Sequence, residues 1–202
     1  MSLFRKIFGK KTDDPNQKVD DDGRSKYMPE IELPIDERFT IQFKANGGKF
    51  LYCIDQSEIN ENFKNILIEN GWEDENVFLI DKRLEKKFKN FSFKTTKSVN
   101  ESVFFFSTCE YLVANDGSLL ISSNQIKEKK LKELPANFII FATTSQLVEN
   151  ISEGLRGIKD NNKSKIPTNI TTIKHFKVSE EKDFLSYGSS SKNLYLLLLE
   201  DL

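Results

Sequence analysis

The sequence is poor in the residues that build metal centres and cross-links. Its 202 residues include two cysteines, Cys53 and Cys109, and one histidine, His175. The cysteines lie in separate apolar runs, where a thiol behaves as a small hydrophobe, and no CxxC pair exists to hold zinc or an iron–sulfur cluster. A single histidine cannot form a His-rich metal site. We therefore expect no bound metal, no cofactor of the chain's own and no disulfide framework, which favours a reducing, cytoplasmic compartment.

Long apolar runs and a dominant charge are missing as well. No stretch approaches the roughly 18–20 apolar residues that span a bilayer, so we expect no integral membrane segment. The N-terminal sequence MSLFRKIFGKK lacks the apolar core and cleavage site of a secretory signal. With 30 basic and 31 acidic residues, the formal net charge is −1, and this balance predicts no nucleic-acid partner.

Two common catalytic or cofactor signatures are also absent. The pair Gly47-Gly48 precedes a predicted strand, whereas a dinucleotide-binding fingerprint follows a strand and opens a helix. No serine stands between two glycines at the spacing of a nucleophile elbow. These motifs therefore give no direct indication of a reaction.

What is present divides the chain into two parts. Residues 1–28 combine a short basic amphipathic segment with the stretch TDDPNQKVDDDGRS, and this composition predicts a flexible polar tail. The basic segment also allows a second interpretation, contact with a membrane surface or a partner protein. Residues 29–202 carry the apolar periodicity of one folded domain.

Strand-like apolar runs alternate with helical patterns in residues 29–202. Helices are predicted to start at Pro34 and Ser145 and after N-caps at Ser57, Asp81 and Asn124. Strands are predicted at 49–54, 76–80, 103–106, 138–142, 170–173 and 194–199. Several strands are continuously apolar, as they are when both faces of a parallel sheet are covered. The pattern indicates an α/β fold, a three-layer α/β/α sandwich around a mostly parallel sheet.

The segment CEYLVANDGSLLISS, residues 109–123, contains the strongest turn signal in the chain. Apolar runs enter and leave Asn115-Asp116-Gly117, where glycine accepts a positive φ and Asn and Asp tolerate one, so a hairpin is predicted. Backbone N–H groups of this turn and the Ser118 hydroxyl are able to hold an anion such as a carboxylate or phosphate. An ordinary hairpin turn explains the same residues without a ligand, and both interpretations stay open.

Three stretches resemble the lactate-utilisation (LUD) domain family of the LutC/YkgG kind. The first is ERFTIQFKANGGKFLYCID with the following helix EINENFKNIL, which resembles the family's N-terminal module. The second runs from residue 109 to Pro135 and resembles the family's Glu-Thr-Gly-Thr turn, with Gly117 matching the turn glycine and Ser118 the hydroxyl residue after it. The third begins at Ile170, where Lys174-His175-Phe176 stands in the place of the family's Gly-Pro-Ser loop. The later loop from Gly188 to Lys192 stands in the region of its Gly-x-His-Gly-Pro loop.

The resemblance implies a fold of the NagB/RpiA/CoA-transferase-like type. Bacterial members of the family belong to L-lactate oxidation systems and work beside partners that carry iron–sulfur clusters. The resemblance therefore implies a non-catalytic accessory component that binds a small anionic metabolite or such an iron–sulfur partner. Two alternatives remain: an enzyme of CoA-transferase-like fold acting on a small carboxylate or phosphate, and a peripheral interaction protein that uses its basic N-terminus.

The candidate ligand-binding residues come from these loops: Asp116, Gly117, Ser118, His175, Gly188 and Ser189. In the enzymatic alternative, Asp116 or His175 acts as the acid/base group. His175 is also explained as a surface residue at the end of a strand, and the loop at 188–192 as a plain polar connection. No residue is assigned a catalytic role in the leading hypothesis.

Overall fold

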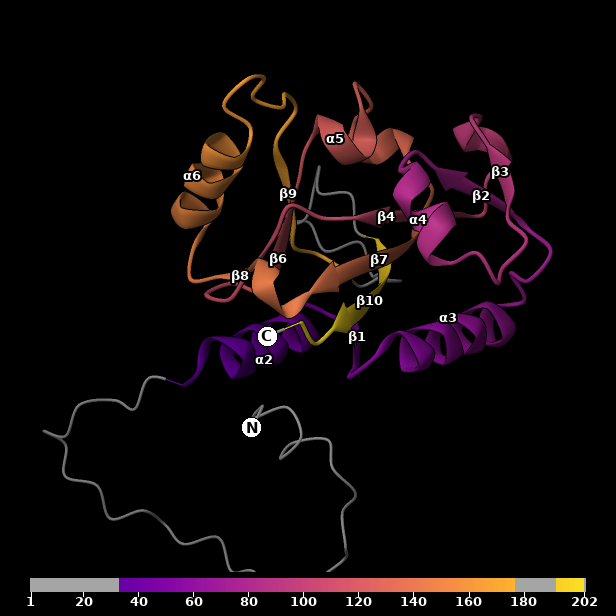
Figure 1. The fold of residues 1–202 in the computed structure, drawn as a ribbon, viewed down its shortest axis with the longest axis horizontal. Coiled ribbons are helices and arrows are strands. Elements are labelled where there is room, and N and C mark those ends of the chain that lie inside the picture. The colour runs from indigo at the N-terminus through magenta and orange to yellow at the C-terminus, as the bar shows by residue number, and fades with distance from the viewer. Residues whose placement is uncertain (1–32, 177–191, 202) are drawn as a thin grey trace, which may run out of the picture.

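A six-stranded parallel sheet forms the centre of the protein (Figure 1). The computed structural model describes residues 33–176 and 192–201. The strand order is β1-β10-β7-β4-β2-β3, and every neighbouring pair runs parallel. The strands are β1 (Lys49–Cys53), β2 (Asn76–Leu79), β3 (Lys94–Thr96), β4 (Phe104–Thr108), β7 (Asn137–Thr143) and β10 (Asn193–Leu199). The predicted mostly parallel sheet is confirmed.

The central strands are apolar because both faces of the sheet are covered. In β4, Phe105 faces one layer while Phe104 and Phe106 face the other, as the two-residue period of a strand requires. The same division holds along the long strands β7 and β10, whose central residues are all buried. Continuous apolar sequence in these strands therefore reflects two cores on opposite sides of one sheet.

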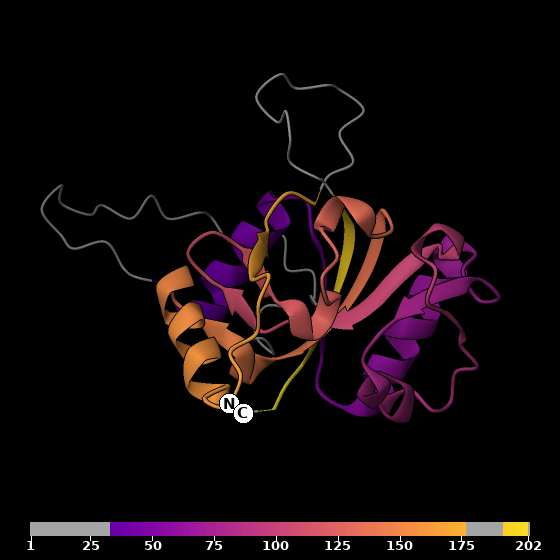
Figure 2. The same ribbon diagram turned by 90° about the horizontal axis from the view of Figure 1, so that it is seen from above.

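One face of the sheet is covered by α3 (Gln56–Asn70) and α4 (Lys82–Lys87). Phe63 of α3 is fully buried against the rings of Phe88 and Phe106, with centroids 5.0 Å and 4.8 Å away. Much of the large phenylalanine content thus fills this layer. Figure 2 shows these two helices on the opposite side of the sheet from α6 (Ile151–Asn161).

The other face carries α2 (Ile35–Ala45) and a second sheet of four short strands, β8-β5-β6-β9. These are β8 (Leu147–Val148), β5 (Tyr111–Val113), β6 (Ser118–Ile121) and β9 (Thr171–Ile173), and α6 packs on their outer face through Ile158. The antiparallel β5–β6 pair is the predicted hairpin. Helical layers on both sides of the parallel sheet make this the expected three-layer α/β/α sandwich.

Three helix starts differ from the sequence prediction. Helix α3 begins two residues earlier than expected, because the N-cap is Asp55, whose side chain accepts the Glu58 N–H at 2.9 Å. The helix predicted after Asn124 is the short α5 (Ser123–Ile126), capped by Ser122, and a 3-10 turn at Leu131–Glu133. The helix predicted from Ser145 starts only at Ile151, because Leu147 and Val148 pair with β5 as strand β8.

Several predictions fall outside the described residues. The expected tail at 1–28 and the loop positions Gly188 and Ser189 lie there, so the domain boundaries stay predictions. Within residues 33–176 and 192–201, no helix has the length and apolar character needed to cross a bilayer.

Candidate functional site

A cleft of about 740 Å³ opens at the carboxyl ends of β2, β4 and β7. Because these parallel strands end at one edge of the sheet, the residues that follow them meet there. The lining is mostly polar and comes from the strand ends, α4, α5 and the end of α6. The residues are Ile80, Asp81, Lys82, Arg83, Leu84, Lys87, Thr108, Cys109, Glu110, Asn124, Gln125, Lys127, Phe141, Gln146, Asn161 and Asn162.

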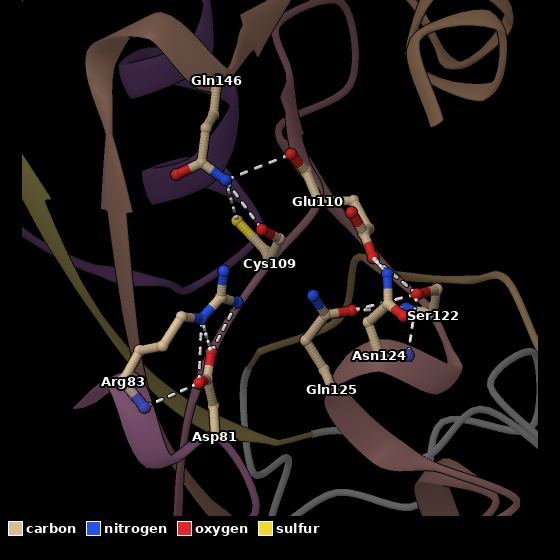
Figure 3. Close-up of polar contacts among 8 residues, drawn as sticks. All are labelled: Asp81, Arg83, Cys109, Glu110, Ser122, Asn124, Gln125 and Gln146. Atoms are coloured by element: carbon tan, nitrogen blue, oxygen red, sulfur yellow. Dashed lines mark hydrogen bonds and ion pairs between the residues drawn. The ribbon is translucent and has the colours of Figure 1, made fainter. Parts of the chain in front are cut away.

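Asp81 and Arg83 form a two-pronged ion pair on one side of the cleft (Figure 3). Arg83 Nε donates to both carboxylate oxygens at 3.0 Å, and a terminal nitrogen donates to Oδ2 at 2.7 Å. Asp81 also caps α4, as predicted, by accepting the Arg83 backbone N–H at 2.9 Å. The Arg83 hydrogen bonds hold the pKa of Asp81 below its usual value, and the charge of Lys127 adds to this effect. Asp81 is therefore an anchor for Arg83 and a poor proton acceptor.

Glu110 lies on the other side of the cleft, where hydrogen bonds to one of its two carboxylate oxygens hold it in place. Its Oε1 accepts the Ser122 hydroxyl at 2.5 Å and the Asn124 amide at 2.9 Å. Both hydrogen bonds go to Oε1, and Oε2 accepts none from residues 33–176 and 192–201. Gln125 completes the support, since its Oε1 accepts the Ser122 N–H at 2.8 Å. The result is a fixed carboxylate with one oxygen available in the cleft (Figure 3).

Gln146 fixes the backbone at the end of β4. Its Nε2 donates to the Cys109 carbonyl at 2.7 Å and to the Glu110 carbonyl at 3.1 Å, and its Oε1 accepts the Thr143 N–H at 2.8 Å. The Cys109 thiol is buried beneath this amide, and burial raises the thiol pKa well above its ordinary value. A thiol that stays protonated at neutral pH is a weak nucleophile. We therefore assign Cys109 to the floor of the cleft.

The charges of the lining favour an anion. Four cationic side chains, those of Lys82, Arg83, Lys87 and Lys127, share the cleft with two carboxylates, and one of those carboxylates is already paired with Arg83. Lys87 also lies over the Phe141 ring, 4.8 Å from its centroid. Clefts lined by one sign of charge concentrate ligands of the opposite sign.

Asp116, Gly117 and Ser118 lie away from this cleft, at the β5–β6 turn, where they pack on α2. Asn46 donates to the Asp116 carbonyl at 2.7 Å, and Asp116 Oδ1 accepts the Ser118 N–H and hydroxyl at 3.1 Å and 2.6 Å. A Cβ on Gly117 would lie 2.4 Å from backbone atoms of α2. These contacts give the turn a structural role, and ligand binding by it stays a prediction.

His175 is exposed, and it does not line the cleft either. The structure brings its chain neighbour Lys174 to the turn, with the Lys174 ammonium 3.8 Å from Asp116 Oδ2. The segment that contains His175 and the turn that contains Asp116, which were predicted as separate sites, are thus neighbours in the structure. Gly188 and Ser189 lie outside the described residues, so their role remains a prediction. In the described part of the chain, no three His, Cys, Asp or Glu side chains gather as metal ligands.

The positions of several cleft residues relative to the predicted strands were a signal for the cleft. Asp81 follows β2, and Cys109 and Glu110 follow β4, so both positions belong to the carboxyl edge of a parallel sheet. Gln146 gave no such signal, because it was predicted inside a helix and instead ends a 3-10 turn. The Ser122 support of Glu110 lies at the open end of the predicted hairpin, whose strands pair Tyr111 with Leu120, so the hairpin signal already indicated that these two residues are close.

The fold and the cleft define an α/β/α sandwich protein with a polar cleft at the carboxyl edge of its sheet. The family model described as LUD domain matches residues 37–199, and the chain belongs to this family. Among solved structures, it is similar in fold to a DUF162 family protein from Deinococcus radiodurans, with a TM-score of 0.58 and 12% sequence identity. That match covers 83% of this chain and 96% of the other. No curated protein matches the sequence.

Proposed function

We propose that this LUD-domain protein is a non-catalytic accessory component of a lactate-utilisation system, and that it binds an anionic metabolite in the cleft at the ends of β2, β4 and β7. The observation that carries the proposal is the set of four cations in the cleft, which outnumber its two carboxylates. Family membership supports the link to lactate oxidation, with iron–sulfur subunits as partners and the cytoplasm as the compartment.

The chemistry of the cleft supports binding more strongly than catalysis. Asp81 is engaged by Arg83, and the Cys109 thiol stays protonated at neutral pH. Asp116 and His175, the acid/base groups of the enzymatic alternative, lie outside the cleft. No contact among the described residues favours a CoA-transferase-like reaction over ligand binding.

Deletion of the gene in its host, followed by growth on L-lactate, tests the proposal. We expect slower growth and slower lactate consumption, both restored by the wild-type gene. A Lys82→Gln/Lys87→Gln gene should fail to restore them, because two of the four cations of the cleft are lost. A Lys86→Gln/Lys89→Gln gene is the matched control, since these exposed residues belong to the same region but do not line the cleft. Unchanged growth after deletion would overturn the proposal.

A further inference from the structure

The cleft is large for a three-carbon acid. Its volume of about 740 Å³ falls within the range of about 300–1,000 Å³ that is typical of sites for drug-sized ligands. Lactate fills a small fraction of such a space, and most of the lining would then have no ligand atom to contact. The size of the cleft therefore indicates a longer ligand.

Cations concentrate around the Asp81–Arg83 side of the cleft. Lys82, Arg83 and Lys87 belong to the single short helix α4. Lys127, which follows α5, also lies close enough for its charge to lower the pKa of Asp81, behind the larger effect of the Arg83 hydrogen bonds. Arg83 is held in place by Asp81, and most of its side chain, 84%, remains exposed to solvent and to ligand. An arginine fixed in this way presents N–H donors that suit phosphate and carboxylate oxygens.

The opposite side is built for hydroxyl groups. It carries Oε2 of Glu110 together with the side-chain amides of Asn124 and Gln125, of which only Asn124 Nδ2 and Gln125 Oε1 are used in hydrogen bonds among residues 33–176 and 192–201 (Figure 3). The Gln146 amide is already bonded to the backbone through both its nitrogen and its oxygen. Amides both donate and accept hydrogen bonds, and a carboxylate oxygen accepts from hydroxyl groups. The Glu110 charge contributes to raising the pKa of Arg83, after the larger effects of Asp81, so the two sides lie within electrostatic reach of each other. One ligand can therefore contact both.

Apolar ligands fit this lining poorly. The aromatic side chain of the lining is Phe141, which is 7% exposed and already covered by Lys87. The cleft thus offers little surface for a fatty chain or a stacked base.

We propose that the ligand is an anionic polyol, a sugar phosphate or a sugar acid, whose charged group binds at Arg83 and the neighbouring lysines and whose hydroxyl groups donate to Glu110. This inference rests on one part of the proposed function, namely that the ligand binds in this cleft. It adds the chemical class of the ligand and names Glu110 as the residue that determines specificity for hydroxyl groups.

Isothermal titration of the full chain tests the class of ligand. The probes are glucose 6-phosphate, gluconate, L-lactate, inorganic phosphate and glucose. We expect glucose 6-phosphate to bind about tenfold more tightly than phosphate, or gluconate about tenfold more tightly than L-lactate, because hydroxyl groups add charge-assisted hydrogen bonds. Whichever pair shows the gain identifies the source of the anion, and glucose alone should bind weakly.

The variant Glu110→Gln tests the assigned residue. It should lose about tenfold in affinity for the preferred polyol anion while its affinity for the corresponding small anion stays the same or improves, because a repulsive charge is removed. Glu128→Gln, a nearby exposed carboxylate outside this cleft, is the matched control and should behave as wild type. Equal losses for polyol and small anion in Glu110→Gln would overturn the assignment.

The outcomes separate the two proposals. If lactate and phosphate bind but the hydroxylated anions bind no more tightly, the polyol inference fails and the cleft remains an anion site. If no anion binds, the binding part of the proposed function fails as well. The wild-type comparison decides the ligand class even if Glu110→Gln, checked by its thermal unfolding, does not fold.

Discussion

Gly117 shows how one residue serves both a turn and a packing contact. Its φ of 65° lies in the left-handed region that glycine adopts at little cost. Its missing side chain also allows the hairpin to approach α2, where a Cβ would lie 2.4 Å from the Gln42 carbonyl carbon and the Phe43 nitrogen. The Asn-Asp-Gly turn predicted the positive φ. It did not predict the contact with α2, because that contact joins segments about 70 residues apart.

The substitution Gly117→Ala should lower the free energy of unfolding by more than about 2 kcal/mol, because left-handed strain of about 1–2 kcal/mol adds to the steric clash. Gly71→Ala is the matched control. Gly71 has a φ of 67°, but a Cβ at this position would have no atom within 4 Å, so only the strain should remain. Urea unfolding of both variants measures the difference, and equal losses would contradict the role of the α2 contact.

At the level of helices and strands, the sequence located most elements but misplaced several starts. Apolar periodicity depends on which face is buried, and it identified the buried face of α3 correctly. It located α6 less well, because Ile151 and Leu155 of the predicted apolar stripe are exposed. The first residues of a helix depend on which side chain reaches a free N–H, and near α3 both Asp55 and Ser57 are chemically suitable. The start of α6 was wrong because Leu147 and Val148 fit a helical stripe, yet they pair with β5. Strand pairing is decided by distant residues.

The cap of α3 gives a prediction for a single element. Asp55→Ala should destabilise the protein by about 1 kcal/mol, because the Glu58 N–H loses its acceptor. Ser57→Ala should have little effect, since Ser57 is exposed and lies inside the first turn. Thermal unfolding of the two variants compares them. A larger loss from Ser57→Ala would show that the helix begins where the sequence predicted.

Across the molecule, two cores on either side of the central sheet contain most of the phenylalanine side chains. One lysine, Lys192, is buried as well. Lys192 enters β10 with its ammonium donating to the Leu134 and Pro135 carbonyls, each at 2.9 Å, above the Phe138 ring. No carboxylate is among these partners. Burial lowers the pKa of Lys192 from 10.5 to about 8.

This lysine makes stability depend on pH. Between about pH 8 and 10.5 the unfolded chain retains the Lys192 proton while the folded protein has released it, so the Lys192 contribution favours folding more strongly as pH rises. Burial raises the pKa of Cys53 to about 11 and also raises that of Cys109, which acts in the opposite direction above about pH 9. Comparison with Lys192→Met, which retains both thiols, isolates the lysine.

Urea unfolding at pH 8 and pH 10 provides the measurement. The unfolding free energy of wild type minus that of Lys192→Met should increase between the two pH values. A difference that stays constant would mean that Lys192 titrates normally in the folded protein.

The class of fold, the hairpin and the family followed from the amino-acid sequence, because local propensity, apolar periodicity and turn chemistry act over a few residues. The position of the cleft and the groups that line it depend on three-dimensional packing. Asp81, Glu110 and Lys127 become neighbours because parallel strands end at one edge of the sheet and α5 folds back over it. The turn at Asp116 had the stronger sequence signal, but it lies outside this cleft and packs against the C-terminal end of α2. Electrostatic and hydrogen-bonding partners are set by distance in space, which the spacing of residues along the chain does not give.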